Sequence, residues 1–433
     1  MKPTGLLIAA GLLAVLGGLV YWSSKHEPTD AKGTDSANKI LSIPEDQFQE
    51  IRIKKLTGEA IALSRDTGKW RITEPKPLPA DQDAVAAVVG ALASLNADKA
   101  VEDKATDLAA YGLNQPTLDV QIKRKDGKTE GLLIGDDTPT GSGAYVKLSS
   151  DAKVSTIASF TKSALDKSVD DLRDKKLMTF DADKLTRVEL QSKGQTVEFG
   201  KNNSGEWQIV KPRPLRADSS AVTALVDKLR DAKMDLTATD DPAKGFAASQ
   251  RIALATVTDA GGTQTLEVRR DANKNLFAKS SAIDGVYKVA SDVGDGVEKG
   301  LDDFRSKKLF DFGFSDPGKV DLKNASYTKS GDKWTSNGKT MDNATVQTLI
   351  DKLRDLAASK FAESGSGEPV FEAAVTSNGG KHTEKVVIRK QGAKYFAQRD
   401  GEPSIYELDS APVDDLIKAA GDVKEAAPEP AKK

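Results

Sequence analysis

The 433-residue sequence contains no cysteine and only two histidines, His26 and His382. The absence of cysteine excludes disulfide bonds, a thiolate nucleophile and zinc sites with cysteine ligands. His26 lies in a polar segment near the N-terminus, and His382 lies beside the Gly379-Gly380 turn, far away in the chain. We interpret both as solvated side chains, and we expect no metal and no cofactor.

An excess of charge of one sign is also absent. The chain has 63 Lys and Arg against 65 Asp and Glu, and the two signs are interspersed along its length. This balance gives no electrostatic reason to expect nucleic acid binding.

Catalytic and phosphate-binding motifs are absent as well. The sequence has no Gly-x-Ser-x-Gly motif, and the glycine-rich stretch 135–143 lacks the Gly-Lys-Ser/Thr of a phosphate loop. Asp271-Ala272-Asn273-Lys274-Asn275 resembles the first half of a calcium loop, but Leu276 and Ala282 stand where glycine and glutamate are needed. We therefore predict no catalytic, cofactor-binding or metal-binding residue.

A pattern that occurs three times is the strongest feature that the sequence does contain. Each occurrence has an Asp followed four residues later by apolar residues at positions i, i+3, i+4 and i+7, which form one face of an α-helix. The Asp is placed to cap the first turn. The residues are Asp81, Val85, Val88, Val89 and Leu92; Asp218, Val222, Leu225, Val226 and Leu229; and Asp342, Val346, Leu349, Ile350 and Leu353.

A tryptophan in a predicted strand precedes each helix. Trp70 and Trp207 lie fifteen residues before the first helical valine, and Trp334 lies twelve residues before it. We interpret these rings as cover for the apolar helix face, with exposed ligand stacking as the alternative. The three Trp and the three capping Asp are thus predicted structural anchors of a repeat.

Alternating apolar residues and Gly- or Asn-containing turns around these elements predict antiparallel meanders and hairpins. The fold class is therefore α+β, with three tandem repeat units behind an N-terminal transmembrane helix. Further helices are expected around 155–167, 295–302 and 413–420. The predicted boundaries are anchor 1–24, tether 25–43, unit one 44–184, unit two 185–319, a shorter unit three 320–422, and a disordered tail 423–433.

The N-terminal stretch from Gly5 to Trp22 has no charged residue. Eighteen residues at helical rise span about 27 Å, which suffices for a bilayer core. A cleaved signal peptide is the rival interpretation, but no small-x-small site follows the apolar run. We expect residues 5–22 to contact the lipid bilayer as a single-pass anchor, with an extracytoplasmic body.

Several segments together resemble the bacterial family known as domain of unknown function 4340. They are the N-terminal anchor, Gly68-Lys69-Trp70, the stretch from Ala110 to Pro116 (AYGLNQP), Ile134-Gly135 and Tyr145-Val146. The Tyr-Gly-Leu…Pro part occurs cleanly only in the first copy. The resemblance implies membrane-anchored proteins associated with gliding-motility-type ABC transporter subunits, and it carries over no catalytic residue.

We therefore expect a non-enzymatic, membrane-anchored binding or scaffold protein, an accessory of an ABC transporter or envelope assembly. The alternative is an envelope hydrolase that acts on glycans through a pair of carboxylates. A cleft with two close carboxylates in one copy, without equivalents in the others, would favour that alternative.

Overall fold

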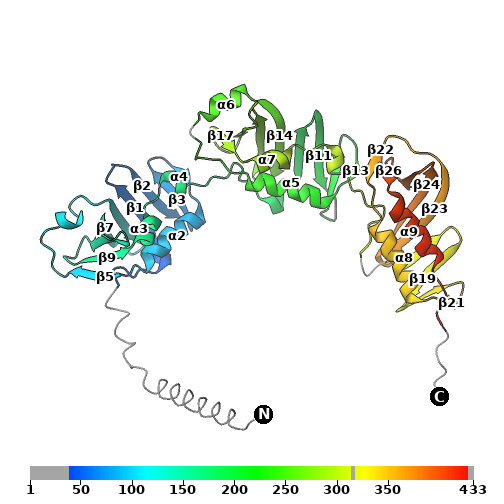
Figure 1. The fold of residues 1–433 in the computed structure, drawn as a ribbon, viewed down its shortest axis with the longest axis horizontal. Helices are drawn as coiled ribbons and strands as arrows, with labels where there is room; N and C mark the ends of the chain where they lie inside the picture. The colour runs from blue at the N-terminus through cyan, green and yellow to red at the C-terminus, as the bar shows by residue number, and fades with distance from the viewer. Residues whose placement is uncertain (1–38, 239, 314–316, 428–433) are drawn as a thin grey trace, which may run out of the picture. The chain divides into compact units, whose positions relative to one another are not determined.

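The computed structural model describes residues 39–238, 240–313 and 317–427. These residues form three antiparallel sheets with helices packed against them (Figure 1). The predicted α+β class is confirmed, and three similar sheets agree with a repeated unit. The chain divides after Lys175 into two compact units, the first with one sheet and the second with two.

The first sheet has the strand order β4-β3-β2-β1-β6-β7-β8-β9-β5. Its strands are β1 (Phe48–Lys55), β2 (Ala60–Asp66), β3 (Lys69–Glu74), β4 (Leu78–Pro79), β5 (Lys99–Glu102), β6 (Leu118–Arg124), β7 (Thr129–Asp137), β8 (Gly143–Leu148) and β9 (Val154–Ala158). Its helices are η1 (Glu45–Gln47), α2 (Gln82–Ala93), η2 (Ala109–Tyr111), α3 (Ser159–Leu165) and α4 (Val169–Leu172).

The second sheet has the order β13-β12-β11-β10-β14-β15-β16-β17. Its strands are β10 (Arg187–Ser192), β11 (Gln195–Lys201), β12 (Trp207–Lys211), β13 (Leu215–Arg216), β14 (Gln250–Asp259), β15 (Gly262–Arg270), β16 (Leu276–Ser280) and β17 (Val286–Val289). Its helices are η3 (Ala182–Lys184), α5 (Ser219–Asp231), α6 (Pro242–Ala248), α7 (Ser291–Val297) and η4 (Leu301–Asp303).

The third sheet has the order β21-β20-β19-β18-β23-β24-β25-β26-β22. Its strands are β18 (Lys319–Leu322), β19 (Ala325–Ser330), β20 (Lys333–Ser336), β21 (Lys339–Thr340), β22 (Lys360–Ala362), β23 (Glu368–Ser377), β24 (His382–Gln391), β25 (Lys394–Arg399) and β26 (Ile405–Leu408). Its helices are α8 (Asn343–Asp355), η5 (Asn378–Gly380) and α9 (Ser410–Gly421).

All three sheets share a central topology. A four-stranded meander leads into a helix, and the chain returns on the other side of the first strand to form a second meander. The first and third sheets add a short strand at the far edge, β5 and β22, where the second sheet has the isolated bridge between Asp235 and Lys288. The first strands pair accordingly, β1 with β6, β10 with β14 and β18 with β23, all antiparallel. The helices α2, α5 and α8 bury their predicted apolar faces in the three cores, because each valine, leucine and isoleucine of the pattern is at most 5% exposed.

The second set of helices begins at different residues than the sequence predicts. The segment expected to be helical from 155 contains the end of β9, and the helix α3 begins only at Ser159. The helix α7 begins at Ser291, four residues before the predicted start at 295. Sheet pairing decides the first case, since Ser155 and Thr156 pair with Val146 and Tyr145 in β8 and β9 pairs with β5 on its other side.

Two charged segments, 170–177 and 302–309, link consecutive sheets. In the second of these, Phe304 is buried in the core of the second sheet and Leu309 in that of the third. Arg305 forms a bridge with Ala217, and Lys308 forms one with Ala357. The segment is therefore tied to both sheets, although its charged side chains alone suggest a solvated connection.

Among the described residues, no helix is long and apolar enough to cross a membrane. The predicted anchor at 1–24 and the tether up to residue 38 lie outside the described residues, as do residues 428–433 of the predicted tail.

Candidate functional site

The most densely charged buried region lies in the second compact unit, where β13 meets the third sheet. We define the junction cluster as Arg216 from β13 together with Glu384, Arg399, Glu402 and Tyr406 from the third sheet. Glu384 and Arg399 occupy strand positions that face the core, beside the buried Val386 of β24 and Ala397 of β25. Buried charges require partners, so their contacts indicate what the cluster can do.

The inner part of the junction cluster is an ion pair. Arg399 Nη2 lies 2.8 Å from Glu384 Oε1, and the two side chains are 10% and 2% exposed. Glu384 also accepts a hydrogen bond from the Asp311 N–H at 2.8 Å. Arg399 donates through Nη1 to the Leu309 carbonyl. Both charges are therefore compensated, and both side chains fix the chain segment that enters the third sheet.

The outer part is centred on the Glu402 carboxylate. It accepts hydrogen bonds from Arg399 Nε at 2.8 Å, from Arg216 Nε at 2.7 Å and from the Tyr406 hydroxyl at 2.7 Å. Burial alone would raise the pKa of Glu402, but these donors outweigh it and lower the pKa. Glu402 is therefore held as a carboxylate, which is unsuitable for a general acid.

The other two members titrate away from neutral pH. Burial raises the pKa of Tyr406, with the hydrogen bond to Glu402 adding to the effect. Burial lowers the pKa of Arg216, yet its contacts with Tyr406 and Glu402 raise it overall. These three pKa shifts all favour the protonation states that the hydrogen bonds of the outer part require, as in a structural network.

Strand register identifies the equivalent positions in the second sheet. Arg399 pairs with Val386 across β24 and β25, and Ser280 pairs with Leu266 across β15 and β16. Ser280 therefore corresponds to Arg399. Gln264 lies two residues before Leu266, as Glu384 lies two residues before Val386, so Gln264 corresponds to Glu384.

Gln264 performs the same backbone task as Glu384. Its Oε1 accepts a hydrogen bond from the Thr179 N–H at 2.9 Å, at the entry to the second sheet. The third sheet thus has a charged pair where the second has a neutral glutamine and serine. Of the two carboxylates that contact Arg399 in the third sheet, Glu384 and Glu402, the first arises from this replacement.

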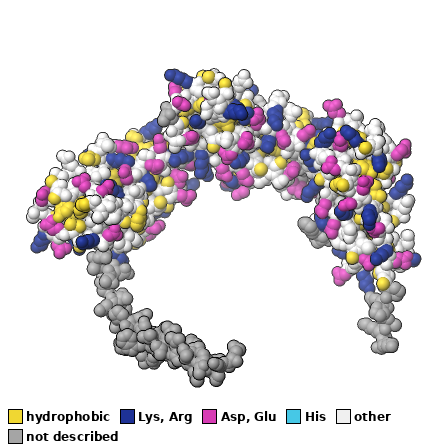
Figure 2. Space-filling view, viewed as in Figure 1, with side chains coloured by type: hydrophobic (Ala, Val, Ile, Leu, Met, Phe, Trp, Pro, Cys, Tyr) yellow, Lys and Arg dark blue, Asp and Glu magenta, His cyan; other side chains and the backbone are white. Residues whose placement is uncertain are grey.

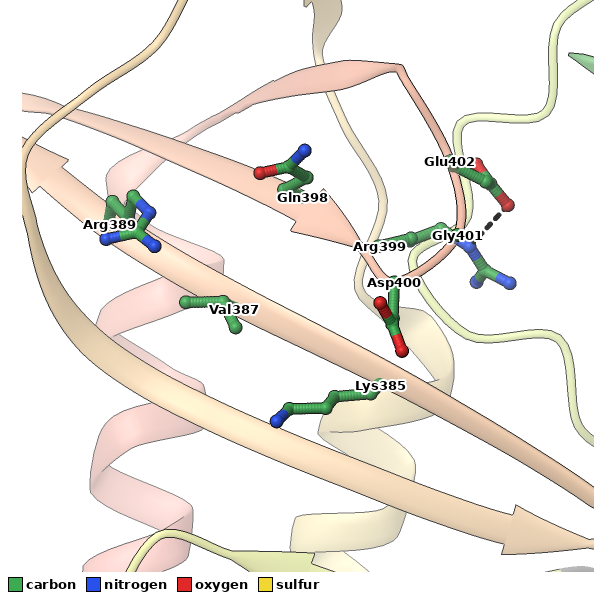
Figure 3. A pocket seen from close by; sticks show the side chains of 8 residues that line it. All are labelled: Lys385, Val387, Arg389, Gln398, Arg399, Asp400, Gly401 and Glu402. Carbon is green, nitrogen blue, oxygen red and sulfur yellow. Dashed lines mark hydrogen bonds and ion pairs between the residues drawn. The ribbon is translucent and has the colours of Figure 1, made fainter.

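A shallow cavity of about 360 Å³ adjoins the junction cluster. Figure 3 shows Lys385, Val387 and Arg389 along β24, Gln398 on β25, and the turn 399–402 at one end. Lys385 Nζ is paired with Glu372 at 2.7 Å on the same open face of the sheet. The cavity is polar and of mixed charge, which suits contact with another macromolecule better than enclosure of a small apolar ligand.

The structure places the predicted anchors within the three cores or at helix starts. Trp70, Trp207 and Trp334 are at most 8% exposed. The side chain of Asp81 accepts from the N–H groups of Asp83 and Ala84.

The other two aspartates also cap their helices. Asp218 accepts from the N–H groups of Ser220 and Ala221, and Asp342 accepts from that of Thr345. None of these residues belongs to the junction cluster, so the repeat signal marks packing and not this site.

The remaining candidates are dispersed. His382 is 55% exposed, with Nε2 3.8 Å from Glu384, and His26 lies outside the described residues. Asn275 donates through its backbone and its side chain to Asp271, which closes a hairpin turn. Within the described ranges, no group of three or more His, Asp or Glu is placed to hold a metal ion.

Sequence reasoning missed the junction cluster, although one signal was present. Along β24, Glu384 has the same parity as Val386 and Ile388, which face the core. A carboxylate on the apolar face of an alternating strand requires a buried cationic partner. The partner, Arg399, could then be sought in the neighbouring strand.

Surface charge does not single out another site. Figure 2 shows Lys and Arg side chains interspersed with Asp and Glu over the visible face of the described residues. Many of these are exposed ion pairs, such as Lys228–Asp292 at 2.7 Å, which contribute little individually.

Comparison with known proteins gives a family and no closer relative. The family model described as "Domain of unknown function (DUF4340)" matches twice, over residues 70–208 and 207–376. No curated protein and no solved structure matches the chain. The first match begins in β3 and ends in β12 of the second sheet, and the second match begins in β12 and ends in β23 of the third sheet. The boundaries of the matches therefore do not coincide with those of the sheets.

Proposed function

Because the chain belongs to the family of domain of unknown function 4340, whose description assigns no activity, we propose that it is a non-enzymatic scaffold or binding protein. The junction cluster carries this proposal. Its carboxylates accept hydrogen bonds from Arg216 and Arg399, and Glu384 stands where the second sheet has a glutamine that also accepts from a backbone N–H at the entry to its sheet. The chemistry that stands out most is thus used to fix the structure.

The architecture supports the same function. Three sheets with the same central strand arrangement follow each other along the chain, and in the third sheet the face of β24 and β25 away from the core carries the exposed Lys385 and Gln398. Repeated units of this kind provide extended surfaces for partners. We propose the open face of β24 and β25, beside the junction cluster, as one contact surface.

Membrane attachment is part of the proposal and rests on the uncharged stretch from Gly5 to Trp22. The anchor would hold the body on the extracytoplasmic side of a bacterial inner membrane. The partners would be the permease and ATPase subunits of an ABC transporter, or another envelope assembly.

A photocrosslinking experiment tests the proposal. A photoreactive amino acid replaces Gln398 on the open face of β25, and a tag follows Lys433. In a matched control it replaces Lys279, which has the same register position in β16 of the second sheet. We expect transporter subunits to be crosslinked from Gln398, and the Lys279 variant shows whether the second sheet shares the surface.

Two results would contradict the proposal. A body that is inaccessible to protease in spheroplasts would place it on the cytoplasmic side. Retention of envelope glycan without any protein partner, together with glycan cleavage that a Glu402→Gln substitution abolishes, would favour the hydrolase.

A further inference from the structure

The third sheet has a cavity of about 340 Å³ that is separate from the junction cluster. It lies where the β18–β19 hairpin, the start of β23 and the last turn of α9 meet. Its lining combines apolar side chains, among them Leu322, Phe371 and Ile417, with the polar Lys323, Asn324 and Glu372. A cavity of this volume with an apolar part and a polar part suits an amphiphilic small ligand.

One polar side chain in this lining lacks a partner. Tyr327 is only 5% exposed, and its hydroxyl makes no hydrogen bond to any residue that the structure describes. Burial raises its pKa, and no other group contributes to that shift. The hydroxyl oxygen itself remains accessible to solvent, so a ligand oxygen that enters the cavity would replace water as its hydrogen-bond partner.

The hairpins of the first two sheets show how the cavity arises. In the last apolar pair before the hairpin turn on the core face, Ile53 faces Ile61 and Leu190 faces Val197. In the third sheet, Leu322 faces Ala325. The branched side chains that fill this position in the first two sheets are thus replaced by a single methyl group.

The segment that closes each unit differs in the same direction. Asp218 donates its N–H to the carbonyl of Phe304, and the Phe304 ring packs edge-on against Phe199 with centroids 4.9 Å apart. In the third unit, the equivalent N–H of Asp342 donates to the carbonyl of Lys424, whose side chain is exposed.

The first unit has the buried Leu172 at this place, bonded to the N–H of Asp81. Only the third unit therefore combines a small hairpin residue with a charged closing residue. It also carries a tyrosine, Tyr327, where the register of the second sheet has Phe199.

We propose that this cavity binds a single-chain amphiphile with an anionic head group, such as a fatty acid. The hydrocarbon chain would occupy the apolar lining, and a head-group oxygen would accept a hydrogen bond from Tyr327. Lys323 lines the rim, is exposed and makes no ion pair with another described residue. The nearby Glu372 carboxylate is compensated by Lys385 at 2.7 Å.

The experiment uses the full chain expressed in bacterial cells and a photoreactive dodecanoate. After irradiation, labelled peptides are located by mass spectrometry. We expect labelling near Tyr327 and Ile417 that unlabelled dodecanoate suppresses. The equivalent hairpins 53–61 and 190–197 of the same molecule serve as internal controls and should stay unlabelled.

Three substitutions separate the contributions. Ala325→Val restores the residue type of the second sheet and should abolish labelling by filling the cavity. Tyr327→Phe should reduce labelling about fivefold without lowering stability, because its hydroxyl has no protein partner. Lys323→Glu should weaken labelling by dodecanoate up to about fivefold and leave a photoreactive dodecanol unaffected, whereas the exposed Lys329→Glu on the same hairpin changes neither.

Equal labelling of all three hairpins, or labelling unchanged by Ala325→Val in a folded chain, would overturn the proposal. The source of the ligand is tested with the same photoreactive chain esterified in a phospholipid. Labelling by the free acid alone identifies a free fatty acid, and labelling by the phospholipid identifies a membrane lipid.

Discussion

In the second sheet, the Gln264 side chain accepts a hydrogen bond from the Thr179 N–H, and in the third, Glu384 accepts one from the Asp311 N–H. Both N–H groups need an acceptor at the entry to their sheet, but in the third sheet this acceptor is the charged side chain of Glu384, which is only 2% exposed. A buried carboxylate is tolerable only with a partner, and Arg399 is present where the second sheet has Ser280. Comparison within one chain thus separates what the fold requires from what one unit has added.

The largest effect is expected when only one member of the Glu384–Arg399 pair is replaced by its counterpart from the second sheet. Arg399→Ser leaves Glu384 buried without its partner and should destabilise the third sheet by about 3–5 kcal/mol. Glu384→Gln combined with Arg399→Ser reproduces the second sheet and should recover most of that loss. Hydrogen exchange of β24 and β25 peptides across a urea series measures both. A double variant as unstable as the single one would refute the equivalence of the two pairs.

The closing segments give the next comparison. Phe304→Ala removes a ring that is 2% exposed and packs on Phe199, and it should cost about 3–5 kcal/mol. Lys424→Ala, at the equivalent place in the third unit, should change stability by less than about 0.5 kcal/mol, since its side chain is exposed. Thermal unfolding, monitored by hydrogen exchange of peptides from each unit, checks this contrast. Similar losses of stability for the two variants would mean that the two positions are not equivalent.

Helix capping should show no such contrast. Replacing Asp81, Asp218 or Asp342 by alanine removes the acceptor for the first-turn N–H groups and should cost about 1 kcal/mol in each unit. Exchange of the first-turn amides of α2, α5 and α8 reports the loss directly. Asparagine at the same positions should retain most of the stability, and a unit that is insensitive to alanine would not depend on its cap.

The smallest effect concerns acid stability. Hydrogen bonds from Arg187 and Lys211 lower the pKa of Glu198 from 4.5 to about 2. The contribution of Glu198 to the free energy of unfolding is therefore fully present above pH 4.5, its pKa in the unfolded chain, and is lost as the pH falls towards 2. Glu198→Gln should flatten the stability of the second sheet over that interval. Glu74→Gln in the first sheet should matter less, since Arg52 and Glu74 are both more than 40% exposed.

Sequence reasoning succeeded where a single periodicity decided the outcome. The helical faces of α2, α5 and α8 could be predicted, because their apolar residues recur at helical spacing and all become buried. It failed at α3, where sheet pairing extends β9 to Ala158 before the helix begins. The extension of β9 depends on its pairing with β8, a partner strand that the local sequence pattern of β9 does not identify.

The sequence by itself determined the α+β class, the repeated helix with its Asp cap and the Trp strand before it, because propensity, capping and alternation are local properties. Only the tertiary structure brought Arg399 onto Glu384, Arg216 onto Glu402, and Tyr327 into a cavity, since these groups come from separate strands or segments. Burial then makes these contacts necessary, because the same side chains in water would need neither a partner nor a ligand.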